Sequence, residues 1–340
     1  MLVARKLSDR MLALNRQGRV PFAVTAQGHE ACQVASAFAL RPEHDWVATY
    51  YRDLGVVLAL GMTSREVMLH FFSRDLDPCS GGRQMPNHWS YPRLRIITGS
   101  SVVATQIPHA VGLALASKLR GEDDVTVAYF GEGGSSEGDF HEGLNFASIH
   151  QLPVIFFCEN NGYAITEPQS RQMAIENVAD RGSAYGIAGQ VVDGNDPLAV
   201  YQTMTWAVSA CRHGHGPKLI EAKTYRLVPH TSSDDDRRYR SRAEVEEWAK
   251  KDPVIRFRDR LLQQEIVTEA RIDLLDSRAE AEVDDAVEFA EKRPLPSPED
   301  AFTHVYAVSQ AASSGKARSR HSAPARRSGT GRFRADKHAA

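Results

Sequence analysis

The stretch "YFGEGGSSEGDFHEG" (residues 129–143) decides the fold, because it joins two elements of different kinds. The apolar run before it, 125–130, predicts a buried strand, and the apolar spacing of 140–150 predicts a helix. A glycine-rich loop between a strand and a helix typically binds an anion through its free backbone N–H groups and the positive end of the helix. This loop has no Lys or Arg and carries Glu132, Glu137 and Asp139. The stretch therefore predicts an α/β unit whose anion-binding loop is acidic.

The rest of the chain continues this alternation of strands and helices. We expect strands at 153–158, within 186–196 and at 217–227, and helices at 105–121 and 196–214. Strands separated by helices predict an α/β fold with a mostly parallel sheet and helices on both of its faces.

Three polar segments come directly after predicted strands. They are the quoted loop, "ENNGYA" (159–164) and "RLVPHTSS" (226–233). Because ligands of such sheets bind at the carboxyl ends of the strands, we expect these segments to meet at one edge.

Helical patterns extend the fold at both ends. The first 75 residues are predicted to be mostly helical, and the opening residues favour an ordinary helix over a signal peptide or a mitochondrial presequence. Residues 76–96 predict an ordered loop. Ser241 to Glu244 has the pattern of a capping box, and a second helix is expected at about 268–292. We predict a single domain over 1–315, followed by a basic tail at 316–340 that is too poor in large apolar residues to fold.

Composition narrows the class of protein. The chain has 340 residues, is 42% hydrophobic and 25% charged, and has a formal net charge of −2, which gives no reason to expect nucleic acid as a partner. Its apolar runs are shorter than the roughly 20 residues of a membrane span. The four cysteines are scattered without a CxxC pair, which predicts neither a disulfide framework nor a zinc site and favours a reducing compartment, the cytoplasm.

An acidic loop suits a phosphate ligand if a metal ion lies between them. Mg²⁺ binds carboxylate, amide, carbonyl and phosphate oxygens together, so Glu132 is a candidate ligand. Asn161, thirty residues after Gly131 and at the end of the next strand, offers an amide oxygen, and Tyr163 a backbone carbonyl. Alternatively, the glycines and asparagines are only turn residues. A Walker P-loop is absent, and "GEGGSS" lacks the third glycine of the dinucleotide motif.

These segments together resemble a known family. "GEG" and "NN" at this separation resemble the thiamine-diphosphate motif. With "GGRQMPNHW", "GSSVVATQIPHAVG", "VDGND" and "LIEAKTYRLVPHTSSDDDRRYRS", the chain is similar, from about residue 5 to 310, to the alpha subunit of branched-chain 2-oxo acid dehydrogenase. The resemblance implies the thiamine-diphosphate-binding fold, with extra N- and C-terminal helices.

The resemblance also implies roles for individual residues. Mg²⁺ is expected at Glu132, Asn161 and the carbonyl of Tyr163, and His230 is expected near the reacting carbon. The residues expected at the cofactor are Tyr51, Arg52, Ser101, Val103, Gly133, Gly134 and Arg226, together with the metal ligands and His230. A potassium site is expected at Ser100, Thr105 and Gln106, and His88 is either a substrate-channel residue or an ordinary loop histidine.

Departures from the family pattern leave more than one 2-oxo acid possible as the substrate. Glu159 stands where mammalian branched-chain relatives carry Arg, which removes one cation from the diphosphate, and Pro229 replaces a histidine beside His230. The alternatives are pyruvate or acetoin dehydrogenase, a non-catalytic paralogue, and a nucleotide-binding switch protein.

The resemblance implies that this chain is half of an active site. In the family, oxidative decarboxylation of the 2-oxo acid is followed by acyl transfer to a lipoyl group on an acyltransferase core. The glutamate that faces the aminopyrimidine ring belongs to a separate beta subunit, and no acidic residue here matches it. The expected assembly is α2β2, without a nucleic-acid or membrane partner.

Overall fold

The computed structural model describes residues 1–303 and 305. The chain divides into two compact units, Met1–Ser297 and Pro298–Ala340, and the described part of the second contains one short 3₁₀ helix, η5 (Pro298–Phe302). The predicted boundary at 315 and the predicted basic tail at 316–340 lie outside the described residues.

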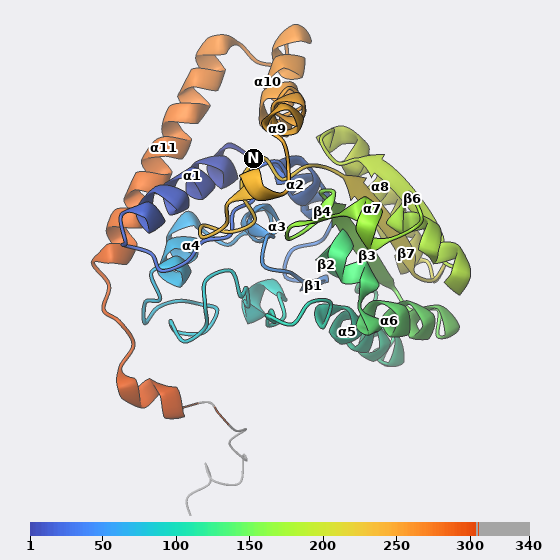
Figure 1. Ribbon diagram of the computed structural model, residues 1–340. Helices are drawn as coiled ribbons and strands as arrows, with labels where there is room; N and C mark the ends of the chain where they lie inside the picture. Colours follow the sequence, from blue (N-terminus) through green and yellow to red (C-terminus); the bar gives the residue numbers. More distant parts are fainter. Residues whose placement is uncertain (304, 306–340) are drawn as a thin grey trace, which may run out of the picture. The chain divides into compact units, whose positions relative to one another are not determined.

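A parallel sheet forms the centre of the first unit (Figure 1). Its five strands are β1 (Trp46–Ala48), β2 (Thr126–Gly131), β3 (Val154–Asn160), β6 (Ala188–Asp193) and β7 (Lys218–Lys223). Their order is β1-β2-β3-β7-β6, and every pair is parallel. A separate two-stranded antiparallel pair is formed by β4 (Tyr163–Ala164) and β5 (Glu167–Pro168). The predicted α/β class and parallel sheet are confirmed.

Helices surround this sheet. The α-helices are α1 (Leu2–Arg16), α2 (Glu30–Phe38), α3 (Leu54–Ala59), α4 (Ser64–Phe71), α5 (Gln106–Arg120), α6 (Gly138–Ile149), α7 (Gln169–Gln172), α8 (Pro197–Arg212), α9 (Arg242–Ala249), α10 (Pro253–Gln263) and α11 (Glu269–Glu291). The 3₁₀ helices of this unit are η1 (Pro92–Leu94), η2 (Glu132–Ser136), η3 (Val178–Tyr185) and η4 (Asp236–Arg238). No described helix is long and apolar enough to cross a membrane.

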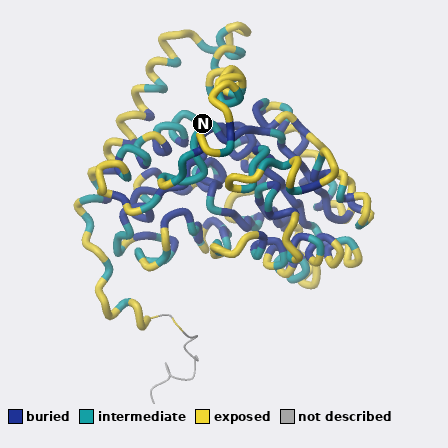
Figure 2. Tube along the Cα trace, in the orientation of Figure 1, coloured by how far each residue is buried: buried dark blue, intermediate teal, exposed yellow. Residues whose placement is uncertain are grey.

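Alternating strand residues divide the core into two layers. Val127 and Tyr129 pack with helices α1 to α4, α8 and α11 on one face of the sheet. Ala128 and Phe130, which point the other way, pack with α5 and α6 on the opposite face. Strands β2, β3 and β7 are buried, whereas the edge strand β6 is mostly exposed. Figure 2 shows the interior of this unit buried and much of α10 and α11 exposed. Helices therefore cover both faces, as predicted.

One local prediction gains a detail, and another needs correction. The N-terminal region is not only helical, because Trp46–Ala48 forms the edge strand β1 beside β2. The capping box at α9 is half formed, since the Ser241 side chain accepts a hydrogen bond from the Glu244 backbone. The Glu244 carboxylate instead accepts hydrogen bonds from the hydroxyls of Tyr163 and Tyr225. The predicted helix at 268–292 is confirmed as α11.

The register of the sheet brings the polar segments to one edge. Gly131 at the end of β2 lies opposite Glu159 of β3, and Asn160 of β3 lies opposite Lys223 of β7. The loops that follow β2, β3 and β7 therefore start side by side, as the sequence predicted. The loop after β1 joins them and supplies Tyr51 and Arg52.

Candidate functional site

A cavity of about 210 Å³ lies at this edge of the sheet. Most of the predicted site residues line it: Tyr51, Arg52, Ser100, Ser101, Val103, Gln106, Glu132, Gly133, Gly134, Asn161, Tyr163 and Arg226. Thr105 and His230 are outside this lining, although His230 contacts Tyr51, Arg52 and Arg226 within it. The structure thus brings together segments that are distant in sequence.

Glu132 presents a carboxylate oxygen with no partner. The side chain is 1% exposed, and its Oε2 accepts a hydrogen bond of 3.2 Å from the Asn161 backbone N–H. Its Oε1 is buried and has no hydrogen-bond partner among the described residues. Burial raises the pKa of Glu132, so the charged form costs free energy unless a cation neutralises it. An unpaired buried carboxylate oxygen in a cavity is the arrangement that a divalent cation would complete.

His29 is a site residue that sequence reasoning missed. Its Nε2 lies 3.3 Å from Nδ2 of Asn161, and both side chains are buried. An unprotonated Nε2 accepts a hydrogen bond from this amide, which fixes the side on which the Asn161 oxygen lies. Burial, followed by the nearby Arg52 and Arg226, holds the pKa of His29 well below its ordinary value, so the ring is neutral. A lone histidine in a loop carries no periodicity that could have identified it.

Position 133 requires glycine because the η2 backbone passes close to Ala164. A Cβ atom at this position would lie 2.9 Å from Cβ of Ala164, whereas at Gly134 the nearest atom would be 3.6 Å away. Only glycine therefore leaves the η2 backbone close to the turn after β3, with its N–H groups free for an anion.

We expect Gly133→Ala to weaken binding of inorganic diphosphate at least about 10-fold, because the added methyl group displaces the η2 backbone at a cost of roughly 1–3 kcal/mol. Gly134→Ala is the matched control and should change the dissociation constant less than about 2-fold, since the methyl group fits. Isothermal titration of both variants measures the difference. Equal effects of the two substitutions would contradict this role of Gly133.

Two buried arginines face the cavity without a carboxylate partner. Arg52 and Arg226 are each 1% exposed, and no carboxylate of the described residues lies within 4.0 Å of either guanidinium. Arg52 donates to the Thr25 carbonyl at 2.8 Å, and Arg226 donates to the Ile165 carbonyl at 2.8 Å. Burial and the charge of Arg52 lower the pKa of Arg226. Two unneutralised cations at a cavity form a site for a multivalent anion.

His230 lies where these two guanidiniums meet. Its Nδ1 is 3.3 Å from Nη2 of Arg52 and 3.4 Å from Nη1 of Arg226, so Nδ1 acts as an acceptor and the neutral ring carries its proton on Nε2. Burial, followed by the charges of Arg52 and Arg226, lowers the pKa of His230 to about 3. The Tyr51 ring packs edge-on against the imidazole, with 5.9 Å between the ring centroids.

This arrangement predicts a pH dependence of stability. Because the pKa of His230 is about 3 in the folded chain against an ordinary 6.5, the unfolded chain binds a proton in this window that the folded chain does not. Stability of the ligand-free chain should fall as the pH is lowered from about 6.5 towards 3, by about 2 kcal/mol at pH 5 from this residue. His230→Asn should lack that loss in urea unfolding at pH 7 and pH 5. The same pH dependence in the variant and the unaltered chain would exclude His230 as the cause.

The segment 100–106 forms one wall of the cavity. Ser101 is hydrogen-bonded through its hydroxyl to Nε2 of His88, so His88 contacts the site. Val103 is 49% exposed at the cavity. The Ser100 hydroxyl accepts a hydrogen bond from the Val102 N–H, and the Gln106 amide donates to the Tyr129 carbonyl. The potassium site predicted at Ser100, Thr105 and Gln106 stays a prediction.

Glu159 does not line the cavity. It is fully buried and accepts hydrogen bonds from the Gln33 amide at 2.9 Å and the Tyr50 hydroxyl at 3.0 Å. Burial raises its pKa to about 7. Its effect on a bound anion is therefore indirect, through Tyr50, which does line the cavity.

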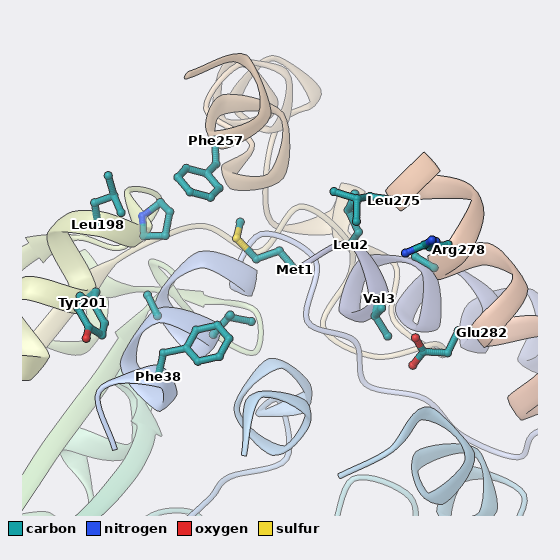
Figure 3. Close-up of a pocket in the computed structure, with 14 residues that line it drawn as sticks. Met1, Leu2, Val3, Phe38, Leu198, Tyr201, Phe257, Leu275, Arg278 and Glu282 are labelled. Atoms are coloured by element: carbon teal, nitrogen blue, oxygen red, sulfur yellow. The ribbon is translucent and has the colours of Figure 1, made fainter. Parts of the chain in front are cut away.

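A larger cavity of about 800 Å³ lies elsewhere in the first unit, between the start of α1 and helices α2, α8, α10 and α11 (Figure 3). Its lining is mainly apolar and includes Phe38, Tyr201 and Phe257, with Arg278 and Glu282 as the charged members. Its two charged side chains have opposite signs and the rest of its lining is mainly apolar, so it suits an anionic cofactor less well than the cavity at the strand ends.

Fold and site together define a class: a parallel α/β protein whose strand ends bring two buried guanidiniums without a carboxylate partner beside a carboxylate oxygen without a partner. Residues 1–299 match the dehydrogenase E1 component family, and the chain belongs to that family. This match confirms the family, fold and enzyme class predicted from the sequence. It argues against the alternative of a nucleotide-binding switch protein. Membership implies the use of thiamine diphosphate, together with beta-subunit and acyltransferase partners. The unpaired Glu132 oxygen, the Gly133 approach and the two guanidiniums fit such a cofactor.

Relatives with named activities are similar over most of the chain. The chain is 50% identical over 307 residues to the 2-oxoisovalerate dehydrogenase subunit alpha of Bacillus subtilis, covering 90% of this chain and 93% of that protein. It is 41% identical over 310 residues to the 3-methyl-2-oxobutanoate dehydrogenase subunit alpha of Mycobacterium tuberculosis, covering 90% and 81%. It is 42% identical over 300 residues to the human mitochondrial 2-oxoisovalerate dehydrogenase subunit alpha, covering 88% and 67%.

Proposed function

We propose that this chain is the alpha subunit of the decarboxylating component of a branched-chain 2-oxo acid dehydrogenase complex. It acts with a beta subunit in an α2β2 assembly, and the acyl group passes to a lipoyl group on an acyltransferase core. The names of its relatives support the substrate class. The four free, buried cysteines are compatible with a reducing compartment, and we place the protein in the cytoplasm.

The single observation that carries this proposal is the unpaired Oε1 of Glu132 in a cavity that also contains Arg52 and Arg226. Glu132, the Asn161 amide oxygen and the Tyr163 carbonyl would hold Mg²⁺, and the guanidiniums would bind the diphosphate. When bound, thiamine diphosphate supplies the electron sink for loss of CO₂ from a 2-oxo acid. His29 orients Asn161, and the turn at Gly162, with a φ of 85°, carries the chain from Asn161 to Tyr163.

The residues around the cavity support a half-site that a second chain completes. A volume of about 210 Å³ is smaller than the roughly 300–1,000 Å³ of typical ligand sites. Val102, Val103 and Ile165 line it and are 66%, 49% and 55% exposed. Exposed apolar side chains at a cavity favour cover by a partner. Glu132 and Glu137 are the acidic residues in the described lining. Glu132 is assigned to the metal and Glu137 does not match the family's glutamate, so the acid facing the aminopyrimidine ring would come from the beta subunit, as the family resemblance implies.

His230 has a positioning and proton-handling role in this proposal. Its Nδ1 accepts from both guanidiniums, which leaves the Nε2 proton as the donor. A bound diphosphate would offset the charges of Arg52 and Arg226 and so raise the pKa of His230 towards the range useful for proton transfer.

The test compares substrates with the assembled enzyme. The chain and its beta partner are purified together with Mg²⁺ and thiamine diphosphate, and decarboxylation is followed with an artificial electron acceptor. We expect kcat/KM for 2-oxoisovalerate to exceed that for pyruvate by at least about 10-fold, or ~1.4 kcal/mol of transition-state discrimination.

The other outcomes separate the alternatives. A preference for pyruvate or acetoin would keep the cofactor site and overturn the branched-chain assignment. Binding of the cofactor without turnover of any of the three substrates would indicate a non-catalytic paralogue.

A further inference from the structure

Three side chains of different chemistry meet in the interior outside the cofactor cavity. His70 stands in the last turn of α4, and Asp77 and Cys79 belong to the loop that follows. The three are 0%, 4% and 9% exposed, and one ligand atom from each lies within 4.8 Å of the others. They have no part in the proposed reaction.

His70 has one polar neighbour among the described residues, the Asp77 carboxylate beside Nδ1, and its buried Nε2 has none. Neither Nδ1 nor Nε2 makes a hydrogen bond with the described residues, although Nδ1 lies 3.2 Å from Oδ1 of Asp77. The rings of Phe71 and Trp89 pack around it, with centroids 6.1 and 5.3 Å away. A fully buried polar group without a hydrogen bond costs about 1–3 kcal/mol, so this ring requires an explanation.

Asp77, in contrast, is held firmly in place. Its Oδ1 accepts from the Cys79 N–H at 2.9 Å, and its Oδ2 accepts from the Ser80 N–H and hydroxyl and from the Gly82 N–H at 3.0–3.1 Å. Outer hydrogen bonds of this kind fix the direction of a metal-binding carboxylate. They also turn the loop back, which carries the Cys79 thiol towards His70.

We propose that His70, Asp77 and Cys79 form a binding site for a zinc ion. One imidazole nitrogen, one carboxylate oxygen and one thiolate sulfur are the ligand types of zinc, and a fourth position is left for water. A tetrahedral zinc site holds its ligand atoms roughly 3.3–3.8 Å apart, so small side-chain rotations would close the present spacing. The Cys79 proton would leave to solvent, and Zn²⁺ with one thiolate and one carboxylate gives a neutral centre, which suits a buried position.

Such an ion would fasten the end of α4 to the loop that leads to the active site. The same loop continues to Trp89 and to His88, whose imidazole contacts Ser101 at the cofactor cavity. The sequence conceals this site because its ligands come from three separate positions without a CxxC pair.

The full chain, purified with its beta partner, is the sample for the test. After Mg²⁺ and chelator exchange, we expect one tightly held zinc per alpha chain by elemental analysis. Replacement with Co²⁺ should give a thiolate-to-cobalt charge-transfer band in the absorption spectrum. Cys79→Ala should abolish the band and weaken zinc binding at least about 100-fold. Cys211→Ala, which removes another buried thiol, should retain both.

A second cluster serves as a further control. His44, Asp123 and Asp124 also approach one another, but His44 is half-buried, Asp123 is exposed, and the aspartates already pair with Arg41 and Arg95. His44→Gln should leave the bound zinc unchanged. Zinc that is lost in His44→Gln and retained in Cys79→Ala, or cobalt bound without a thiolate band, would overturn the proposal. Thermal unfolding of ligand-free Cys79→Ala distinguishes loss of the ion from loss of the fold.

Discussion

Glu132→Gln should lower the affinity for thiamine diphosphate in the presence of Mg²⁺ by at least about 100-fold, with little change in the ligand-free chain. A metal site loses its principal charge when a carboxylate becomes an amide. The ligand-free chain keeps its stability within about 1 kcal/mol, because an amide oxygen can still accept the Asn161 N–H bond and a buried charge is removed.

Ligand-induced stabilisation measures this effect directly. A ligand at 100 times its dissociation constant stabilises the folded state by about 2.7 kcal/mol, and a 100-fold weaker variant at the same concentration gains only about 0.4 kcal/mol. Glu137→Gln is the matched control, because Glu137 lines the same cavity on the exposed side of η2. Equal losses in both variants would show a general effect of loop charge and would contradict a metal ligand at Glu132.

The sequence predicted the centre of this site because its signals are local. Continuous apolar runs identify β2 and β3, and glycine and asparagine turns mark their ends. Parallel strands then have to bring Glu132 and Asn161 to one edge. The resemblance to a family extended the prediction to Arg52, Arg226 and Tyr51, and the structure brings all three to the cavity.

The missed features have physical reasons. The strand β1 has three residues, which is too short for any periodicity, yet it sets the place from which Tyr51 and Arg52 leave the sheet. Strand β3 is buried on both faces, so polarity cannot tell which way its residues point. Glu159 shares the parity of Ile155 and Phe157, and it points into the core towards Gln33 and Tyr50. Only tertiary packing decides that direction.

The two unneutralised guanidiniums predict that an anion alone stabilises this chain. Arg52 and Arg226 both reach Nδ1 of His230, so two like charges share a buried space. Inorganic diphosphate should raise the unfolding temperature of the ligand-free chain without Mg²⁺ or thiamine, and added salt should weaken the effect. Arg52→Gln and Arg226→Gln should each weaken diphosphate binding roughly 10- to 150-fold, the value of a charged hydrogen bond of about 1.5–3 kcal/mol. The double variant should lose the response entirely.

Arg95, an arginine that is paired with a carboxylate, is the control for the Arg52 and Arg226 variants. Arg95 donates to the buried Asp124 at 2.6 Å, so its charge is already neutralised within the fold. Arg95→Gln should lower the free energy of unfolding, because Asp124 loses its partner, and should leave the diphosphate-induced increment unchanged. Arg52→Gln or Arg226→Gln should change the free energy of unfolding little, because relief of the repulsion between the two charges offsets the lost hydrogen bonds to carbonyl groups. Either substitution should reduce the diphosphate-induced increment. If all three variants lost stability alike and kept the diphosphate response, these arginines would be structural residues and the anion would bind elsewhere.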